Sequence, residues 1–247
     1  MQNCKPYLRE PTLYIPADDL EHLFDALSNV VFFIKNQDSR YTHANITLVT
    51  RLGMKDRKDI IGRRAEELFP SELGKSYSLQ DALVLSGEII NDQLELHLFP
   101  NRVPGWCLTF KRPLIERSQV LGLIGISRDL GYPDTRHPTY NRLQTMLNYM
   151  RKHYAEAIRI ETLAHQVSLS IAQLERHCLC VFRLTPRQLL TKVRIEAAMH
   201  LLRGNESIAE VGFACGYSDQ SAFSRQFKAL VGLTPGHYRA FNAQGKG

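Results

Sequence analysis

The sequence predicts an α+β N-terminal domain followed by an all-α C-terminal domain. Strand-like apolar runs occur only before residue 131, and from residue 141 the apolar residues recur with helical spacing. Between them, "GYPDTRHPTY" combines two prolines, a glycine and polar residues without apolar periodicity. We therefore predict an N-terminal extension (1–17), a first domain (18–131), a linker (132–140) and a second domain (141–243).

Five strand-like runs and three helical segments make up the first domain. Two runs, "VVFFIK" and "YTHAN", flank "NQDSR" and predict a hairpin, and three more follow as "IINDQLELHLF", "WCLTFKRPLI" and "VLGLIGIS". Helical segments lie between the two groups, around "ITLVTRLG", "IGRRAEELFP" and "SLQDALVLSG". This order favours a five-stranded antiparallel sheet with helices packed on one face.

The second domain contains only helical patterns. "YNRLQTMLNYMRKHY" places Leu143, Met146, Leu147 and Met150 on one stripe of an amphipathic helix. Further helices are predicted in "ETLAHQV", "SIAQLERHCLCVF", "PRQLLTKVRIEAAMHLLRG", "SIAEVGFACG" and "DQSAFSRQFKALVG". Thr185 and Thr234 each precede a proline, which is typical of an N-cap followed by the first helical residue.

The composition indicates a reduced, cytoplasmic protein. No stretch of the 247 residues approaches the length of apolar run that spans a membrane, and the N-terminus lacks the pattern of a signal peptide. The five cysteines are odd in number and show no CxxC spacing, which favours free thiols.

The positive charge is confined to the C-terminal part of the chain. Residues 1–140 carry 17 Lys and Arg against 18 Asp and Glu, whereas residues 141–247 carry 14 against 7. Such asymmetry indicates a polyanionic partner, most commonly nucleic acid, although a merely solvated basic face would have the same charge.

The basic part also repeats itself at an offset of 49 residues. The matching pairs are Leu174 with Phe223, Arg176 with Arg225, Cys178 with Phe227, Leu184 with Leu233, Thr185 with Thr234 and Pro186 with Pro235. Ser170 and Asp219, both good N-caps, match at the same offset. Each unit is a short helix, a tight turn and a second helix, which is a helix-turn-helix arrangement.

The repeat decides how the cluster His177, Cys178 and Cys180 is interpreted. Cys178 occupies the place of Phe227 and shares one helical stripe with Leu174 and Val181, so we expect a core thiol. The three side chains diverge around the helix and cannot meet at one ion, and a structural zinc needs four ligands. We therefore predict no metal site.

Burial of these stripes leaves one face of each second helix outward. On the later helix this face carries glutamine, serines, arginine and lysine, which are side chains that read base edges or contact phosphates. A solvated helix face is the alternative, but the feature occurs twice in one basic domain.

The segment "LTPRQLLTKVRIEAAMHLLRGNESIAEVGFACGYSDQSAFSRQFKALVGLTPGHYR" resembles the DNA-binding domain of AraC/XylS-type transcription regulators, over roughly residues 141–241. The resemblance implies seven helices, with two helix-turn-helix units joined by a long helix around 186–203. Matching the family's base-contacting positions gives Ala172, Glu175 and Arg176 in the first unit, and Gln220, Ser221, Ser224 and Arg225 in the second. Lys228 joins these as a candidate phosphate contact.

The first unit departs from the family pattern at four positions. The family usually has an aromatic residue at Cys178, a basic residue at Leu179, and glycine at Ser168 and Arg183. An arginine in a helix-ending position that favours positive φ should cost about 1 kcal/mol.

The runs "VVFFIKNQDSRYTHAN", "IIGRRAEELFP", "GWCLTFKRPLI" and "VLGLIGISRDL" resemble a PAS domain over residues 18–131, a sensory module that binds ligands or dimerises. The positions of Cys4 and Cys107 do not fit a flavin photosensor. His22, His43 and His97 are not in the helix that usually supplies a haem ligand. Candidate contacts to a small polar ligand are Tyr41, Tyr77, Asp81, Trp106 and Lys111.

The sequence thus predicts a DNA-binding transcription regulator, an activator by the resemblance, whose PAS domain senses a signal. Expected partners are promoter DNA, RNA polymerase, a small effector and a second copy of the chain. No nucleophile–base pair or paired carboxylates are recognisable, so we predict neither enzymatic activity nor a cofactor. The alternative is a PAS scaffold whose basic domain binds protein partners.

Overall fold

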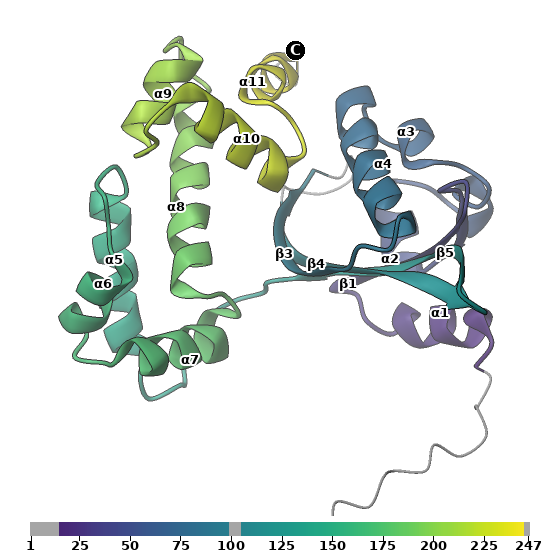
Figure 1. Cartoon of the computed structure of the whole chain (residues 1–247), viewed down its shortest axis with the longest axis horizontal. Coiled ribbons are helices and arrows are strands. Elements are labelled where there is room, and N and C mark those ends of the chain that lie inside the picture. The colour runs from purple at the N-terminus through teal and green to yellow at the C-terminus, as the bar shows by residue number, and fades with distance from the viewer. Residues whose placement is uncertain (1–14, 99–104, 245–247) are drawn as a thin grey trace, which may run out of the picture.

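The computed structural model describes residues 15–98 and 105–244 and shows an α+β part followed by a helical part (Figure 1). The first part contains a five-stranded antiparallel sheet in the order β2-β1-β5-β4-β3, as predicted. Its strands are β1 (Val30–Asn36), β2 (Tyr41–Ala44), β3 (Ile90–His97), β4 (Gly105–Glu116) and β5 (Gln119–Asp129). No helix in the described part of the chain is long and apolar enough to cross a membrane.

Helices lie on both faces of this sheet (Figure 1). They are α1 (Ala17–Asp25), α2 (Ile46–Arg51), the 3-10 helix η1 (Arg57–Asp59), α3 (Ala65–Leu68) and α4 (Ser71–Leu85). The expectation that all helices cover one face is wrong for α1, a helix that was not among the three predicted helical segments. Phe24 of α1 stacks on Phe32 at 4.5 Å, whereas the next strand residue, Phe33, faces the α4 side.

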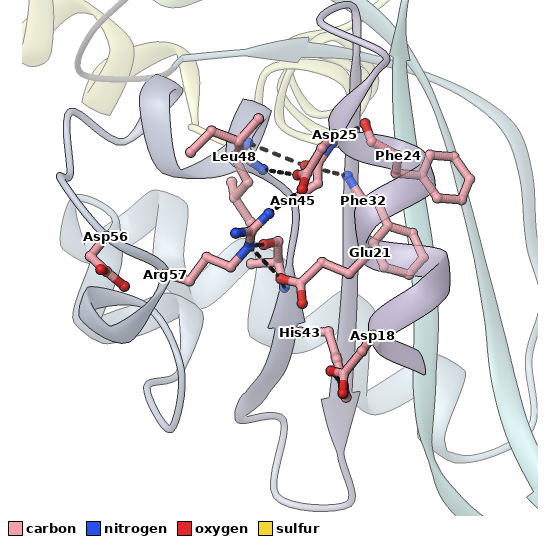
Figure 2. A network of polar contacts seen from close by, with 12 residues as sticks. Asp18, Glu21, Phe24, Asp25, Phe32, His43, Asn45, Leu48, Asp56 and Arg57 are labelled. Atoms are coloured by element: carbon pink, nitrogen blue, oxygen red, sulfur yellow. Dashed lines mark hydrogen bonds and ion pairs between the residues drawn. The ribbon is translucent and has the colours of Figure 1, made fainter. Parts of the chain in front are cut away.

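Polar contacts hold α1 against the β1–β2 edge (Figure 2). The Arg57 guanidinium pairs with Asp25 and, at 2.7 Å, with Glu21. The buried Asn45 accepts a hydrogen bond from the Phe32 amide at 3.0 Å and donates one to the Phe24 carbonyl at 3.0 Å. These bonds fix the position of a short helix whose outer face is exposed.

The second part consists of seven helices, as the family resemblance implies. They are α5 (Tyr140–His153), α6 (Ile160–Gln166), α7 (Ile171–Phe182), α8 (Pro186–Leu201), α9 (Ile208–Ala214), α10 (Gln220–Val231) and α11 (Pro235–Gln244). The first helix-turn-helix unit is α6–α7, the second is α9–α10, and α8 joins them.

Side-chain caps begin the helices of both units, and all four predicted N-caps are confirmed. Ser170 accepts the Gln173 amide at 3.2 Å and Thr185 the Gln188 amide at 3.2 Å. Asp219 accepts the Ala222 amide at 2.7 Å, and Thr234 accepts the His237 amide at 3.2 Å. Capping thus sets the first residue of α7, α8, α10 and α11.

In each unit, residues with left-handed backbone follow the first and the second helix. The second unit uses glycine, with Gly216 at φ 80° and Gly232 at φ 78°. The first unit has Ser168 at φ 52° and Arg183 at φ 60°, so the non-glycine residues do adopt the positive φ that the family pattern predicts. The first unit therefore carries local strain that the second avoids.

Replacing Arg183 with glycine should raise the free energy of unfolding by about 1 kcal/mol, because glycine accepts φ near 60° without steric cost. Urea unfolding followed by circular dichroism measures the change. Gln144→Gly is the control, since Gln144 is exposed in the interior of α5, and glycine there should lower stability by about 1 kcal/mol. A loss of stability in Arg183→Gly would contradict the strain argument.

Candidate nucleic-acid interface and polar cavity

One apolar stripe on each second helix is buried in the helical domain. On α7 the stripe is Leu174, Cys178 and Val181, each at most 2% exposed. On α10 it is Phe223, Phe227 and Val231, all fully buried. The predicted equivalence of Cys178 and Phe227 is confirmed, and these stripes determine which face of each helix stays outward.

Cys178 behaves as a core thiol. Burial raises its pKa to about 12, so the sulfur is protonated at neutral pH and is a poor metal ligand. Cys180 is exposed, and the His177 ring lies against the His137 ring with centroids 5.4 Å apart. Within the described residues, no three His, Cys, Asp or Glu side chains are arranged to hold an ion.

The predicted DNA-reading residues lie on the outward faces of α7 and α10. All of them are exposed except Ser224, which is half-buried: Ala172, Glu175, Arg176, Gln220, Ser221, Arg225 and Lys228. The two helices lie near opposite ends of α8, whose 16 residues make a rod about 24 Å long (Figure 1). Contact of these side chains with DNA stays a prediction.

Three arginines of the basic domain serve a different purpose. Arg142 donates to the Ser168 carbonyl at 2.8 Å, Arg194 to the Glu156 carbonyl at 2.8 Å, and Arg239 to the Glu206 carbonyl at 2.6 Å. Each satisfies carbonyls at a turn or helix end. Part of the positive charge is therefore structural, a role that charge counting did not detect.

A small polar cavity lies in the first domain between the sheet, α2 and α4. Lys35 and Lys111, both nearly fully buried, share Asp81 as counter-ion, and the Lys111 Nζ to Asp81 Oδ1 distance is 2.7 Å. Burial would raise the pKa of Asp81, but the two ammonium groups together lower it below its usual value. The Lys35 ammonium lies 4.1 Å from the Tyr41 ring centroid.

Glu95 forms the second polar centre of this cavity. It accepts hydrogen bonds from Thr109 at 2.6 Å and from the amide of Gln80. Gln80 also accepts a bond from Lys111 at 3.0 Å, so it bridges the two centres. The Tyr77 hydroxyl, which lines the cavity, is buried without a hydrogen-bond partner in the described residues. The free space is about 30 Å³, room for one or two waters.

The structure brings together some of the predicted ligand contacts. Tyr41, Tyr77 and Lys111 line the cavity, and Asp81 pairs with Lys111 at its edge. Trp106 lies elsewhere, because its Nε1 donates to Glu196 of α8 at 3.0 Å. Four further lining residues were not predicted: Lys35, Gln80, Glu95 and Thr109. For Lys35 and Glu95 the available signal was a charge inside the apolar runs "VVFFIK" and "LELHL".

Replacing Asp81 with asparagine should lower the free energy of unfolding by about 3–5 kcal/mol, because two buried ammonium groups lose their shared counter-ion. Thermal or urea unfolding at pH 7 measures the loss. Asp38→Asn, at an exposed position, should change stability by less than about 0.5 kcal/mol. Equal stability of the two variants would contradict the ion-pair account.

The Asp81 contribution should also depend on pH. Its folded-state pKa is lowered, so the stabilisation is present above the ordinary aspartate pKa of about 4 and is lost as the pH falls through the folded-state value. We expect the stability difference between the wild type and Asp81→Asn to be constant from pH 7 to 5 and to shrink below pH 4. A difference that stays constant down to pH 2 would contradict the assignment.

Comparison with known proteins identifies both parts of the chain. A helix-turn-helix domain model matches residues 163–240, and a PAS fold model matches residues 24–132. The transcriptional activator RhaS of Escherichia fergusonii is 33% identical over 99 residues, which are 40% of this chain and 36% of that protein. RhaS of Klebsiella pneumoniae is 37% identical over 95 residues, 38% of this chain and 34% of that protein. The matched segment thus spans about a third of these relatives.

Solved structures match the same region. A transcriptional regulator of the AraC type from Chromobacterium violaceum is 28% identical, with 43% of this chain and 96% of that chain covered and a TM-score of 0.41. The DNA-binding domain of AdpA, solved with a target DNA, is 26% identical, with 42% and 96% covered and a TM-score of 0.41. The two family models thus assign a PAS fold to the first part of the chain and a helix-turn-helix domain to the second.

Proposed function

We propose that this protein is a transcription regulator that binds promoter DNA through both helix-turn-helix units and responds to a signal through its PAS domain. The observation that carries the proposal is the pair of exposed polar helix faces held near the two ends of α8 in a basic domain. The relatives named as transcriptional activators support activation as the outcome. RNA polymerase is the partner that we propose for an activator. The proposal assigns no catalytic role.

The second unit supplies the more complete reading face. The Arg225 guanidinium can donate two hydrogen bonds to a guanine edge, the Gln220 amide can pair with an adenine edge, and the Lys228 ammonium can contact a phosphate. Ser221 and Ser224 offer hydroxyls to bases or backbone. The N-terminal turn of α10 would enter the major groove first, as in other helix-turn-helix proteins.

The first unit would read fewer bases. Arg176 corresponds to Arg225, but Glu175 can only accept a hydrogen bond, as from a cytosine amine, and Ala172 offers only a methyl contact. Leu179, which is 47% exposed, stands where the family usually has a basic residue, so one phosphate contact is missing. We propose that the second unit contributes most of the sequence preference.

The polar cavity is the proposed sensor site. The unpaired Tyr77 hydroxyl and the spare N–H groups of Lys35 and Lys111 could donate to a ligand with oxygen acceptors. Such a ligand must be small or must displace side chains, because the free space is about 30 Å³. A change in PAS-mediated dimerisation is a second route by which a signal could act.

Replacing Arg225 with alanine should weaken binding to sites selected in vitro by the wild-type protein by about 1–3 kcal/mol, and it should relax preference at one base pair. Fluorescence anisotropy on the selected site and its single-base variants measures both effects. Arg136→Ala is the matched control, since this linker arginine is 96% exposed and lies outside the reading faces. An equal loss on every sequence would make Arg225 a phosphate contact instead.

A further inference from the structure

The C-terminal end of α10 packs against the PAS domain (Figure 1). A Cβ added to Gly232 would lie 2.5 Å from Leu73 Cδ1 of α4, so the two segments are in close contact. Leu230 packs on apolar clusters that contain residues of both domains. The His237 ring of α11 lies 3.5 Å from the Glu72 carboxylate. The second reading helix is therefore attached to the sensor.

A second contact holds α8 to the outer strands of the sheet. The Trp106 indole of β4 donates a hydrogen bond to Glu196 at 3.0 Å. The Lys192 ammonium lies 5.6 Å from the centroid of the Trp106 ring. Nearby, the Gln188 side chain donates to the Asp92 carbonyl at 3.2 Å. The two domains are thus joined by direct contacts as well as by the linker.

These contacts leave a groove beside the reading face of α10. Arg225, Lys228 and Ala229 form one wall, and α4 together with the start of β3 forms the other. The PAS wall includes Glu88 and the exposed apolar side chains of Leu79, Leu83 and Ile89, and none of the described residues lining it is Lys or Arg.

DNA on this helix would conflict with that wall. A helix in the major groove has a phosphate strand on each flank, and one strand would pass along Arg225 and Lys228 into the groove. In the groove the phosphates of that strand would lie near the Glu88 carboxylate, which repels them. They would also be desolvated by apolar side chains, and no Lys or Arg of the PAS wall would compensate for the lost hydration. The arrangement therefore offers the duplex poor electrostatic complementarity.

We infer that this interdomain contact is autoinhibitory: the PAS domain holds the second reading helix against a wall that disfavours DNA, and tight binding requires the domains to separate. The inference rests on the proposed DNA-binding function. It adds a closed state, with low DNA affinity, and an open state with the full reading face available.

Gln80 provides a path from the sensor cavity to this contact. It lines the cavity and also the groove, and its amide is bonded to Glu95 and Lys111. A ligand that paired with Lys111 or Glu95 would release this amide and alter the α4 surface facing α10. Signal binding would then shift the balance between the closed and open states.

Two variants that keep the net charge test the inference in the full-length protein. Trp106→Ala removes the contact with α8. Ser76→Tyr places a ring at the junction with Gly232, because Ser76 Oγ lies 3.9 Å from the position of a Cβ at Gly232. Ser78→Tyr is the matched control, since Ser78 lies about 200° further round α4. Circular dichroism spectra of all variants establish that they are folded.

Binding to a mixed-sequence 40-base-pair duplex at low salt is measured by anisotropy, and the radius of gyration by X-ray scattering. We expect Trp106→Ala and Ser76→Tyr to bind at least about five-fold tighter than the wild type and to be more extended, with Ser78→Tyr unchanged. Wild-type affinity in both opening variants, when they are folded and more extended, would overturn the inference. Absence of DNA binding in every variant would instead overturn the proposed function.

Discussion

Burial of one apolar stripe on each reading helix is the constraint on which the functional surface depends. With Phe223, Phe227 and Val231 inside, the α10 residues about 100° to 160° from the centre of this stripe face outward, and they include Ser221, Arg225 and Lys228. The same rule orients α7, where the smaller Cys178 replaces the aromatic residue. A helix rotated by one residue would bury Ser224 and Lys228 and expose phenylalanine, so the reading face and the core determine each other.

The helix α10 carries three functions on one short element. The apolar stripe of α10 packs in the core of the helical domain, and the outward face is available to DNA. The C-terminal end of α10 contacts Leu73 of the PAS domain. The proposed reading face and the contact with the sensor domain therefore lie on the same helix.

Patterns local in the sequence predicted much of this structure. Periodicity located all five strands and most helices, the repeat located both helix-turn-helix units, and residue chemistry located the N-caps. The helix α1 was not predicted, although Leu20, Leu23, Phe24 and Leu27 recur with helical spacing. Its place on the sheet depends on charged contacts to Arg57, which are distant in the sequence. Lys35 and Asp81 are 46 positions apart, and only the sheet and α4 bring them together.

Contacts between the domains could not be predicted for the same reason. Trp106 was expected at a ligand, yet it bonds Glu196, 90 positions away. Such pairs depend on how two folded units pack, which neither periodicity nor capping encodes. The reading faces were predictable because they are what remains when a periodic stripe is buried.

The central claim is that the basic helical domain binds DNA, and the salt dependence of binding tests it most directly. Affinity of the full-length protein for a mixed-sequence duplex would be measured between about 50 and 200 mM salt. The account predicts a steep linear fall of log K with log salt, with a slope that reflects several neutralised phosphates. A flat dependence, or no binding at the lowest salt by the wild type and by both Trp106→Ala and Ser76→Tyr, would contradict it and favour a scaffold whose basic domain binds protein partners.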